Sequence, residues 1–212
     1  MLNIRFKLVV GLMLLVTNCV VGASVLPYGP QNDVPVSTVI NDWGWTECYS
    51  ALYAEPFYGP EGNPLANCSG NYMMLAARRT GSDVFEVLAA ARSEDTRPEM
   101  EPKVDGITKR ANGSEWYHAD GFSWGFAGEG DEVFKAICDD KGTDERDRLC
   151  WHTLDYVGGW RAGSYTELNE STDWEKVILV ANTITVPEPT AALLFALALA
   201  SLALRRGSHI SI

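Results

Sequence analysis

An apolar run near the C-terminus, residues 190–204, constrains this chain more than any other segment. The run contains no charged residue and consists mainly of Ala and Leu, which are strong helix formers that lipid tolerates. A Pro-Glu-Pro element at residues 187–189 precedes it, and an Arg pair at residues 205–206 follows it. Proline and a carboxylate suit the first turn of a helix, and arginines suit its last turn on the cytoplasmic side. The layout predicts a membrane helix over residues 190–204.

This predicted helix is short for a permanent anchor. Residues 191–204 would rise about 21 Å as a helix, whereas the hydrocarbon core of a bilayer is about 30 Å thick. The bilayer would have to thin around such a span. An ordinary single-pass anchor and a buried amphipathic helix are the alternatives. The lack of a polar face argues against the buried helix.

The N-terminus has the layout of a secretory signal peptide. A basic start at residues 5–7 is followed by an apolar stretch at residues 8–16 and by a small-residue triplet that ends at Ala23. We therefore expect a signal helix over the first 23 residues, cleavage after Ala23, and an exported part that begins at Ser24. Lipid modification of Cys19 is the alternative, but it needs a small residue before the cysteine, and asparagine stands there.

The C-terminal residues resemble the PEP-CTERM sorting domain of Gram-negative bacteria. The resemblance covers only residues 186–212. The six residues after the Arg pair form a tail that is slightly longer and less basic than is usual in the family. It implies recognition by an exosortase, a membrane-embedded cysteine transpeptidase-like enzyme that acts near the Pro-Glu-Pro element, and a host that makes exopolysaccharide. The residues that carry the sorting signal are Val186, Pro187, Glu188, Pro189, Arg205 and Arg206.

The part between the two signals, residues 24–182, is long enough for one domain with a core of its own. The chain carries 28 Asp and Glu against 17 Lys and Arg. Because all but one of these acids and all but four of these bases lie between residues 24 and 187, the net charge there is −14. A surface this acidic repels nucleic acid and anionic lipid. We expect no nucleic-acid partner.

Four cysteines fall in the exported part of the chain. An even number in an oxidising compartment predicts two disulfides, for which three connectivities are possible. We expect sequential pairing because each half of the domain carries two cysteines, and each bridge would contribute about 3 kcal/mol in the chain-entropy description. A four-cysteine zinc site is the alternative, but no Cys-x-x-Cys pair occurs. The predicted bridges are Cys48–Cys68 and Cys138–Cys150.

Short apolar segments separated by Gly-containing turns predict a mainly β domain. Residues 72–77 and 84–91 form a candidate hairpin around Gly81, although their Ala content would also suit a helix. Aromatic residues cluster in residues 43–53, and the Pro- and Gly-rich residues 55–69 predict a long loop. Further strands are predicted at residues 114–118, 122–126, 132–137, 149–154, 159–165 and 174–181. We expect an antiparallel β-sandwich or jelly roll, flanked by an N-terminal signal helix and a C-terminal transmembrane helix.

Three histidine and aspartate residues are the candidates for chemistry. His118 and Asp120 lie two positions apart, so they share a face if residues 118–120 are extended. Together with His152 they could hold a metal ion or form a general base with its orienting carboxylate. Partly buried, hydrogen-bonded histidines are the simpler interpretation, because no further ligand motif accompanies them.

Two other features allow binding without catalysis. The segment between Cys138 and Cys150 is rich in Asp and Glu, which could hold calcium, although the EF-hand spacing is absent and three basic residues offset the charge. The chain also contains seven tryptophans and eight tyrosines. Exposed rings could stack on sugars, but in a small sandwich most aromatic rings fill the core.

The expected function is that of a structural or adhesive protein of the cell surface or extracellular matrix, without catalysis, metal or cofactor. A module that binds exopolysaccharide and a metal-dependent hydrolase are the alternatives. The expected partners are the exosortase, the membrane through the C-terminal helix and, in the second interpretation, exopolysaccharide. We expect the protein to be anchored in the inner membrane before sorting and to lie at the cell surface or outside the cell afterwards. Whether the tail is cut or kept is open.

Overall fold

The computed structural model describes residues 24–57, 64–101, 104, 106–140 and 146–184. The predicted signal helix, with Ala23 at its end, lies outside these residues. The predicted sorting signal at residues 186–189 and 205–206, and the predicted membrane helix at residues 190–204, also lie outside them. Ser24 is the first residue whose surroundings are defined.

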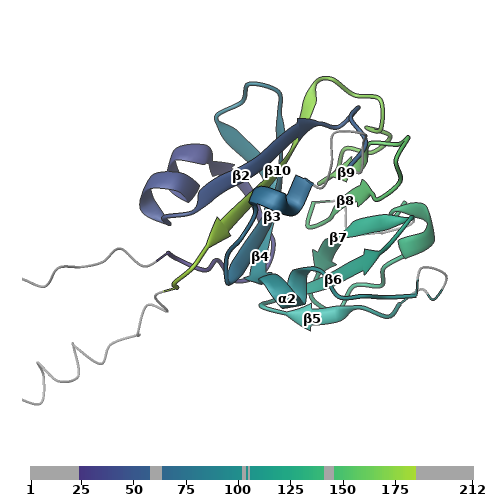
Figure 1. The fold of residues 1–212 in the computed structure, drawn as a ribbon, viewed down its shortest axis with the longest axis horizontal. Coiled ribbons are helices and arrows are strands. Elements are labelled where there is room, and N and C mark those ends of the chain that lie inside the picture. The colour runs from purple at the N-terminus through teal and green to yellow at the C-terminus, as the bar shows by residue number, and fades with distance from the viewer. Residues whose placement is uncertain (1–23, 58–63, 102–103, 105, 141–145, 185–212) are drawn as a thin grey trace, which may run out of the picture.

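The domain is mainly β and consists of two antiparallel five-stranded sheets (Figure 1). The first sheet has the strand order β1-β4-β3-β10-β2, so strands from both ends of the domain lie next to each other. The second sheet is a simple meander of consecutive strands, β5 to β9. Their bounds are β1 (Gln31–Pro35), β2 (Thr46–Leu52), β3 (Tyr72–Arg79), β4 (Val84–Arg92), β5 (Lys109–Ala111), β6 (Ser114–Ala119), β7 (Ser123–Gly128), β8 (Leu149–His152), β9 (Gly159–Ala162) and β10 (Trp174–Ala181).

Four short helical turns connect the strands in the described part of the chain. They are η1 (Thr38–Asp42), η2 (Pro64–Asn67), α2 (Ser93–Thr96) and η3 (Lys135–Ile137). None is longer than five residues, so the helices act as connections and covers and do not form a layer of their own.

The two sheets share a hydrophobic layer between them. The first sheet contributes Leu75 of β3 and Ile178 of β10, and the second sheet contributes Trp124 and Trp151 of β7 and β8, all fully buried. Phe57 joins the ring contacts of both tryptophans, at centroid distances of 5.3 Å and 6.0 Å. The expected sandwich-like arrangement of antiparallel sheets is therefore confirmed at the level of its layers.

Each sheet is also covered on its outer face. On the first sheet, Met74, Leu88 and Leu179 form a second buried cluster with Val39 of η1. On the second sheet, a third cluster includes Tyr117 and Val133, with other residues of strands β6 to β8. A strand that is buried on both faces has a continuous apolar sequence, because no position alternates toward water. This explains why the Ala-rich residues 72–77 and 84–91 form strands, as predicted, and not a helix.

Tyr53 joins the two sheets just after β2. Its backbone N–H donates to Trp174 O at 2.8 Å, and its carbonyl accepts from the N–H of Gly159 at 2.7 Å. Its buried hydroxyl donates to Arg161 O at 3.0 Å and accepts from Trp151 Nε1 at 3.1 Å. One residue thus links β10 of the first sheet with β8 and β9 of the second.

Two glycines make room for this link. A Cβ atom at Gly158 would lie 1.6 Å from Tyr53 O, and one at Gly159 would lie 2.1 Å from Tyr53 Cδ1. Both distances are far below van der Waals contact, so only glycine fits at either position. In the sequence the Gly158-Gly159 pair resembles an ordinary turn signal. In the structure it makes room for the tyrosine that links the two sheets.

Both predicted disulfides are confirmed. Cys48 of β2 is bonded to Cys68 just after η2, with the Cα atoms 5.2 Å apart. Cys138 is bonded to Cys150 of β8, with the Cα atoms 5.6 Å apart. Since all four cysteines of the domain are in disulfides, the alternative zinc site is excluded.

One predicted strand is absent from the structure, and three observed strands were not predicted. Residues 132–137 contain the turn η3 and cover the outer face of the second sheet without joining it. Lys135 is fully buried there, because its ammonium group donates to the carbonyl oxygens of Val104 and Ile107. Ile137, which would share a face with Lys135 in a strand, is 40% exposed. The strands that were not predicted are β1, β5 and, in the aromatic cluster, β2.

Replacing Tyr53 with phenylalanine should destabilise the domain by about 1–3 kcal/mol. The change leaves the buried Trp151 Nε1–H and Arg161 carbonyl without their shared partner, and buried unpaired groups cost about this much. Urea denaturation followed by tryptophan fluorescence measures the difference. Tyr156→Phe is the control, because Tyr156 is 72% exposed. Equal midpoints for the two variants would contradict the assigned role of Tyr53.

Removing the Cys138–Cys150 bridge with a Cys138→Ala, Cys150→Ala double variant should cost about 3 kcal/mol or more. The chain-entropy contribution for a loop of this size is about 3 kcal/mol, and both side chains are fully buried in the outer cluster of the second sheet. The Cys48→Ala, Cys68→Ala variant should lose less packing, since its cysteines are only partly buried. The denaturation midpoints of the two double variants are compared under oxidising conditions. A larger loss of stability in the Cys48→Ala, Cys68→Ala variant would contradict this prediction.

Candidate functional site

The two ends of the described chain meet at one edge of the first sheet. Ser24 forms an isolated parallel bridge with Ile184, and its N–H donates to Thr183 O at 2.9 Å. Its hydroxyl donates to Gly44 O at 2.9 Å, and the residue is only 6% exposed. The first and last coloured segments, purple and yellow-green, lie side by side at this edge (Figure 1). We call this contact of Ser24 with Gly44, Thr183 and Ile184 the terminal clamp.

The residues after Ser24 are also fixed by hydrogen bonds and packing. The N–H of Val25 donates to Trp43 O at 2.8 Å, and Val25 O accepts from Trp45 Nε1 at 2.8 Å. Leu26 and Ile184 both pack against the outer cluster of the first sheet. Residues 24–26 are therefore part of the folded domain.

A shallow groove of about 620 Å³ lies beside the clamp. Arg92 lies over the ring of Tyr72, at 5.9 Å from its centroid. Asn71 donates from Nδ2 to Asn182 O at 2.9 Å, which ties the start of β3 to the end of β10. The groove is built mostly of polar side chains and backbone at strand ends, and it brings together no nucleophile with a base. Its lining residues are Gly70, Asn71, Tyr72, Arg92, Ser93, Glu94, Asn182, Thr183 and Ile184.

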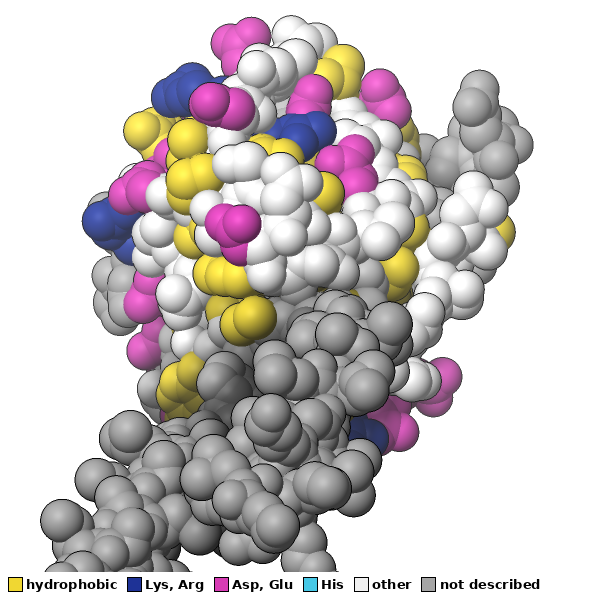
Figure 2. All heavy atoms as spheres, turned by 90° about the vertical axis from the view of Figure 1, so that its left-hand side faces the viewer, with side chains coloured by type: hydrophobic (Ala, Val, Ile, Leu, Met, Phe, Trp, Pro, Cys, Tyr) yellow, Lys and Arg dark blue, Asp and Glu magenta, His cyan; other side chains and the backbone are white. Residues whose placement is uncertain are grey.

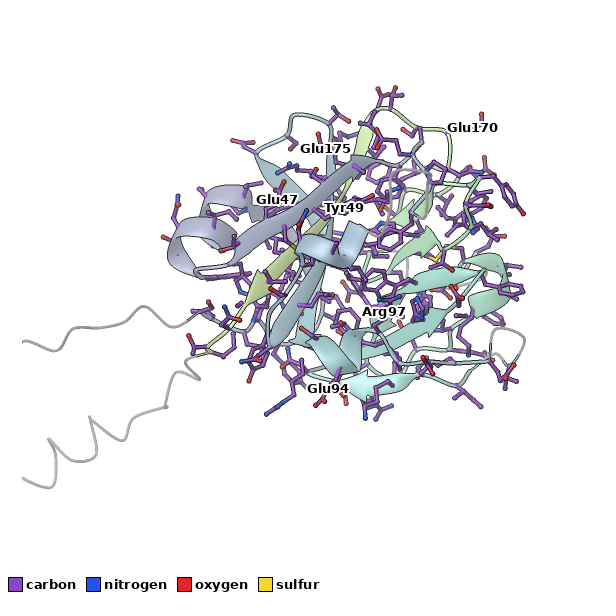
Figure 3. All side chains as sticks on the ribbon, in the orientation of Figure 1. Glu47, Tyr49, Glu94, Arg97, Glu170 and Glu175 are labelled. Atoms are coloured by element: carbon purple, nitrogen blue, oxygen red, sulfur yellow. A yellow bond between two sulfur atoms is a disulfide. The ribbon has the colours of Figure 1, made fainter. Side chains whose placement is uncertain are left out.

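The side of the domain from which the two ends leave is acidic. On its described part, hydrophobic side chains form small groups among Asp and Glu, with fewer Lys and Arg (Figure 2). Two acids of the first sheet share one base: Glu47 and Glu175 lie on the neighbouring strands β2 and β10 (Figure 3), and Arg78 of β3 contacts both. The Arg78 Nε–Glu175 Oε2 distance is 2.5 Å, and the Arg78 Nη2–Glu47 Oε2 distance is 3.6 Å.

The structure does not bring the three candidate catalytic residues together. In the register of β6, β7 and β8, His118 lies opposite Trp124, whereas His152 lies opposite Ser123, one position further along the strand. Successive residues of a strand point to opposite faces, so the two histidines lie on opposite faces of the second sheet. Their ring contacts agree, since His118 lies against Trp124 and His152 against Trp160.

His118 and Asp120 do share a hollow of about 440 Å³. Its other lining residues are Glu99, Met100 and Arg97, which is labelled over the second sheet in Figure 3. Arg97 Nε lies 3.5 Å from His118 Nε2, a distance at the limit of a hydrogen bond. The five lining side chains include neither a serine nor a cysteine, so the hollow offers an imidazole and mixed charges but no hydroxyl or thiol nucleophile.

Burial favours the uncharged form of both described histidines. Burial lowers the pKa of His118 to about 4; Arg97 acts in the same direction and Asp120 opposes it. Burial also lowers the pKa of His152, against the effect of its hydrogen bond with Phe122 O. These are properties of histidines packed among tryptophans, which is the simpler of the two interpretations from the sequence.

The acidic segment around the second disulfide uses its carboxylates internally. Asp139 is fully buried, and its Oδ2 accepts from Arg148 Nη1 at 2.5 Å. Asp147 Oδ1 accepts from Asn32 Nδ2 at 2.6 Å. Residues 144 and 145 lie outside the described chain. Within the described ranges, no three His, Cys, Asp or Glu side chains come together as a metal-binding group. The calcium hypothesis gains no support from this geometry.

The tryptophans mainly fill the core. Trp45, Trp116, Trp124, Trp151 and Trp174 are at most 3% exposed. Trp43 and Trp160 are half-buried, so the seven rings offer no exposed row for stacking on a sugar. In the same described part of the chain, no helix is long and apolar enough to cross a bilayer.

The terminal clamp was not predicted because, apart from the Ser24 hydroxyl, backbone groups form it. Ser24 stands out only as the residue after the expected cleavage site, and no residue type marks Thr183 as its partner. The available signal is the pair of apolar residues Leu26 and Ile184, close to the two ends of the predicted domain. Such residues need a surface to cover, and here both cover the first sheet.

Replacing His118 with glutamine should flatten the acid dependence of stability. The folded pKa of about 4 lies below the unfolded value of 6.5, so the unfolded chain binds more protons between these pH values. The wild-type protein therefore loses stability as the pH falls from 6.5 toward 4, and the variant should lose less. Urea midpoints at pH 7, 5.5 and 4.5 test this, and identical slopes for both proteins would contradict a buried neutral His118.

No protein-family model, curated protein or solved structure matches this chain. The candidate site therefore depends on the geometry of the molecule alone, and that geometry singles out the terminal clamp.

Proposed function

We propose that this protein is an exported structural or adhesive protein of the cell surface or extracellular matrix, sorted by an exosortase through its C-terminal residues. In this proposal residues 1–23 are a signal helix, residues 190–204 a transmembrane helix, and the β domain is the payload. The protein is first held in the inner membrane of a Gram-negative, exopolysaccharide-producing bacterium. No catalysis is assigned to it.

The terminal clamp is the observation that carries this proposal. In a chain with two terminal membrane signals, both ends are at the same membrane during export, and a domain whose ends leave on the same side suits this arrangement. Here Ser24 and Ile184 are bridged to each other. Val186, where the proposed sorting signal begins, comes two residues after Ile184, so the payload would lie directly against the membrane surface.

The disulfides support the route. Two buried or partly buried bridges form and persist in oxidising compartments outside the cytosol. The acidic side of the domain, from which the ends leave, supports release of the domain from the membrane once the tail is cut. Because this side repels anionic lipid, the tail helix would be the main attachment to the membrane, and cutting the tail would free the domain.

Sorting should depend on the Pro-Glu-Pro element. We expect the full chain to stay in the inner membrane of a host that lacks an exosortase, and to reach the surface or the medium when the enzyme is present. A Pro187→Ala, Glu188→Ala, Pro189→Ala variant should stay in the membrane in both hosts. Cell fractionation with intact-mass analysis measures this, and the mass also reports cleavage after Ala23 and two disulfides.

A control comes from the Pro-Glu pair at residues 98 and 99, of which Pro98 is half-buried and Glu99 is exposed. A Pro98→Ala, Glu99→Ala variant removes the same chemistry from the domain surface and should be sorted like the wild type. Recovery of the wild-type chain in the cytosol, with reduced cysteines and both ends intact, would contradict the proposal.

A further inference from the structure

The shallow groove beside the terminal clamp contains two charged side chains that the domain does not use internally. Arg92 ends β4, Glu94 lies in α2 (Figure 3), and both side chains are exposed in the groove. The Arg92 guanidinium lies over the ring of Tyr72. Within the described chain no ion pair involves Arg92 or Glu94, whereas Arg78 and Arg148 each contact two carboxylates. One cation and one anion of the groove are therefore open to a ligand.

Two asparagines add neutral donors and acceptors beside these charges. Asn71 and Asn182 are exposed and line the same groove. The bond from Asn71 Nδ2 to Asn182 O occupies one N–H of the first side chain. A side-chain amide has two N–H donors and an oxygen acceptor, so both asparagines keep groups with which to bind a ligand.

The backbone around the groove is fixed in advance. The N–H of Ser93 donates to Asn71 O at 3.0 Å, and its hydroxyl donates to Gly70 O at 2.6 Å. A Cβ atom at Gly70 would lie 2.9 Å from the Cβ of Val180, so glycine lets the chain before β3 approach the end of β10 closely. A site that needs no ordering on binding loses less affinity than a flexible one.

We propose that this groove binds a neutral oligosaccharide. Its volume of about 620 Å³ lies within the range of small-molecule sites, about 300–1,000 Å³. A saccharide ligand would give the proposed adhesive role its partner, so the inference rests on the proposed function and names the class of molecule to which the domain attaches.

The chemistry of the lining fits a ligand that is covered with hydroxyl groups. A hydroxyl both donates and accepts, whereas a guanidinium only donates and an ionised carboxylate only accepts. The planar fork of Arg92 suits two neighbouring hydroxyl oxygens, Glu94 suits hydroxyl protons, and the two asparagine amides do both. Hydrogen bonds with charged partners are the stronger ones. Such a site holds its ligand mainly by hydrogen bonds, so it does not require a row of exposed tryptophans.

Charge and polarity distinguish this ligand from others. The lining contains one base and one acid, so its own charges balance, and the domain around it is strongly acidic. Phosphates, uronic acids and anionic lipid are therefore repelled. Tyr72 and Ile184 are the two large apolar side chains of the lining, which is too little for the hydrophobic anchors of a bound peptide helix. A neutral polyhydroxyl ligand meets neither obstacle.

A binding experiment with the purified full chain tests the inference. The chain is kept in a detergent without a sugar headgroup and applied to an array of oligosaccharides. The array carries neutral oligomers of glucose, galactose, mannose, rhamnose and N-acetylglucosamine, together with uronic-acid oligomers. The neutral oligomer that binds most tightly is then titrated by calorimetry. We expect Arg92→Ala to weaken its binding about 10-fold or more, because hydrogen bonds with a charged donor are lost. Glu94→Gln should weaken it less, since the amide oxygen still accepts.

The other end of β3 provides a matched control. Arg79 is also exposed and also lies over aromatic rings, at 5.0 Å from the ring centroid of Tyr165 and 4.8 Å from that of Trp174. Arg79→Ala removes the same group from the same sheet, away from the groove, and should leave the affinity unchanged. Urea midpoints of all three variants show whether each is folded.

Three outcomes would overturn the inference: no neutral oligosaccharide binds, only uronic-acid oligomers bind, or Arg92→Ala and Glu94→Gln bind as tightly as the wild type. The result is separate from the sorting experiment. A chain that is sorted normally but binds no neutral oligosaccharide refutes the groove and leaves the export route in place. A chain that stays in the inner membrane even when the exosortase is present refutes the route, whatever it binds.

Discussion

Burial of both faces of each sheet is the constraint on which the rest of this domain depends. Ten strands form three hydrophobic layers, one between the sheets and one on each outer face. The outer layer of the first sheet includes Leu26 and Ile184, so the two chain ends must fold back for the layer to be complete. The terminal clamp follows from this packing, and its hydrogen bonds fix which residues meet. The position of both ends is thus a consequence of the core and not a separate feature.

Patterns that depend on residue type were predictable from the sequence. Sequential disulfides followed from the even number and distribution of cysteines, and most strands followed from short apolar runs between glycine turns. Predictions failed where the partner is distant in the chain. The strand at residues 46–52 alternates poorly because it is an edge strand bonded to Cys68, and the supposed strand at residues 132–137 instead buries Lys135 against backbone carbonyls. From the sequence Gly158 and Gly159 are predicted to form only a turn, because no nearby residue indicates that a side chain at either position would collide with Tyr53.

The same packing separates the candidate catalytic residues. His118 and His152 are separated by the register of three strands, and no spacing in the sequence contains that register. Asp139, which could have held a cation, neutralises the buried Arg148 next to the second disulfide. The buried charges of Asp139 and Arg148 therefore satisfy one another inside a dense β structure.

The most direct test of the account is native-state hydrogen exchange of the full chain, resolved to single amides near the two ends. If the ends belong to the core, the Val25 amide, which donates to Trp43 O, should exchange with the same opening free energy as the amides of β10. A destabilising change in the core should then speed both together. Rapid exchange of Val25 while β10 stays protected would show that the N-terminal residues are not held, and the clamp would no longer support the proposed function.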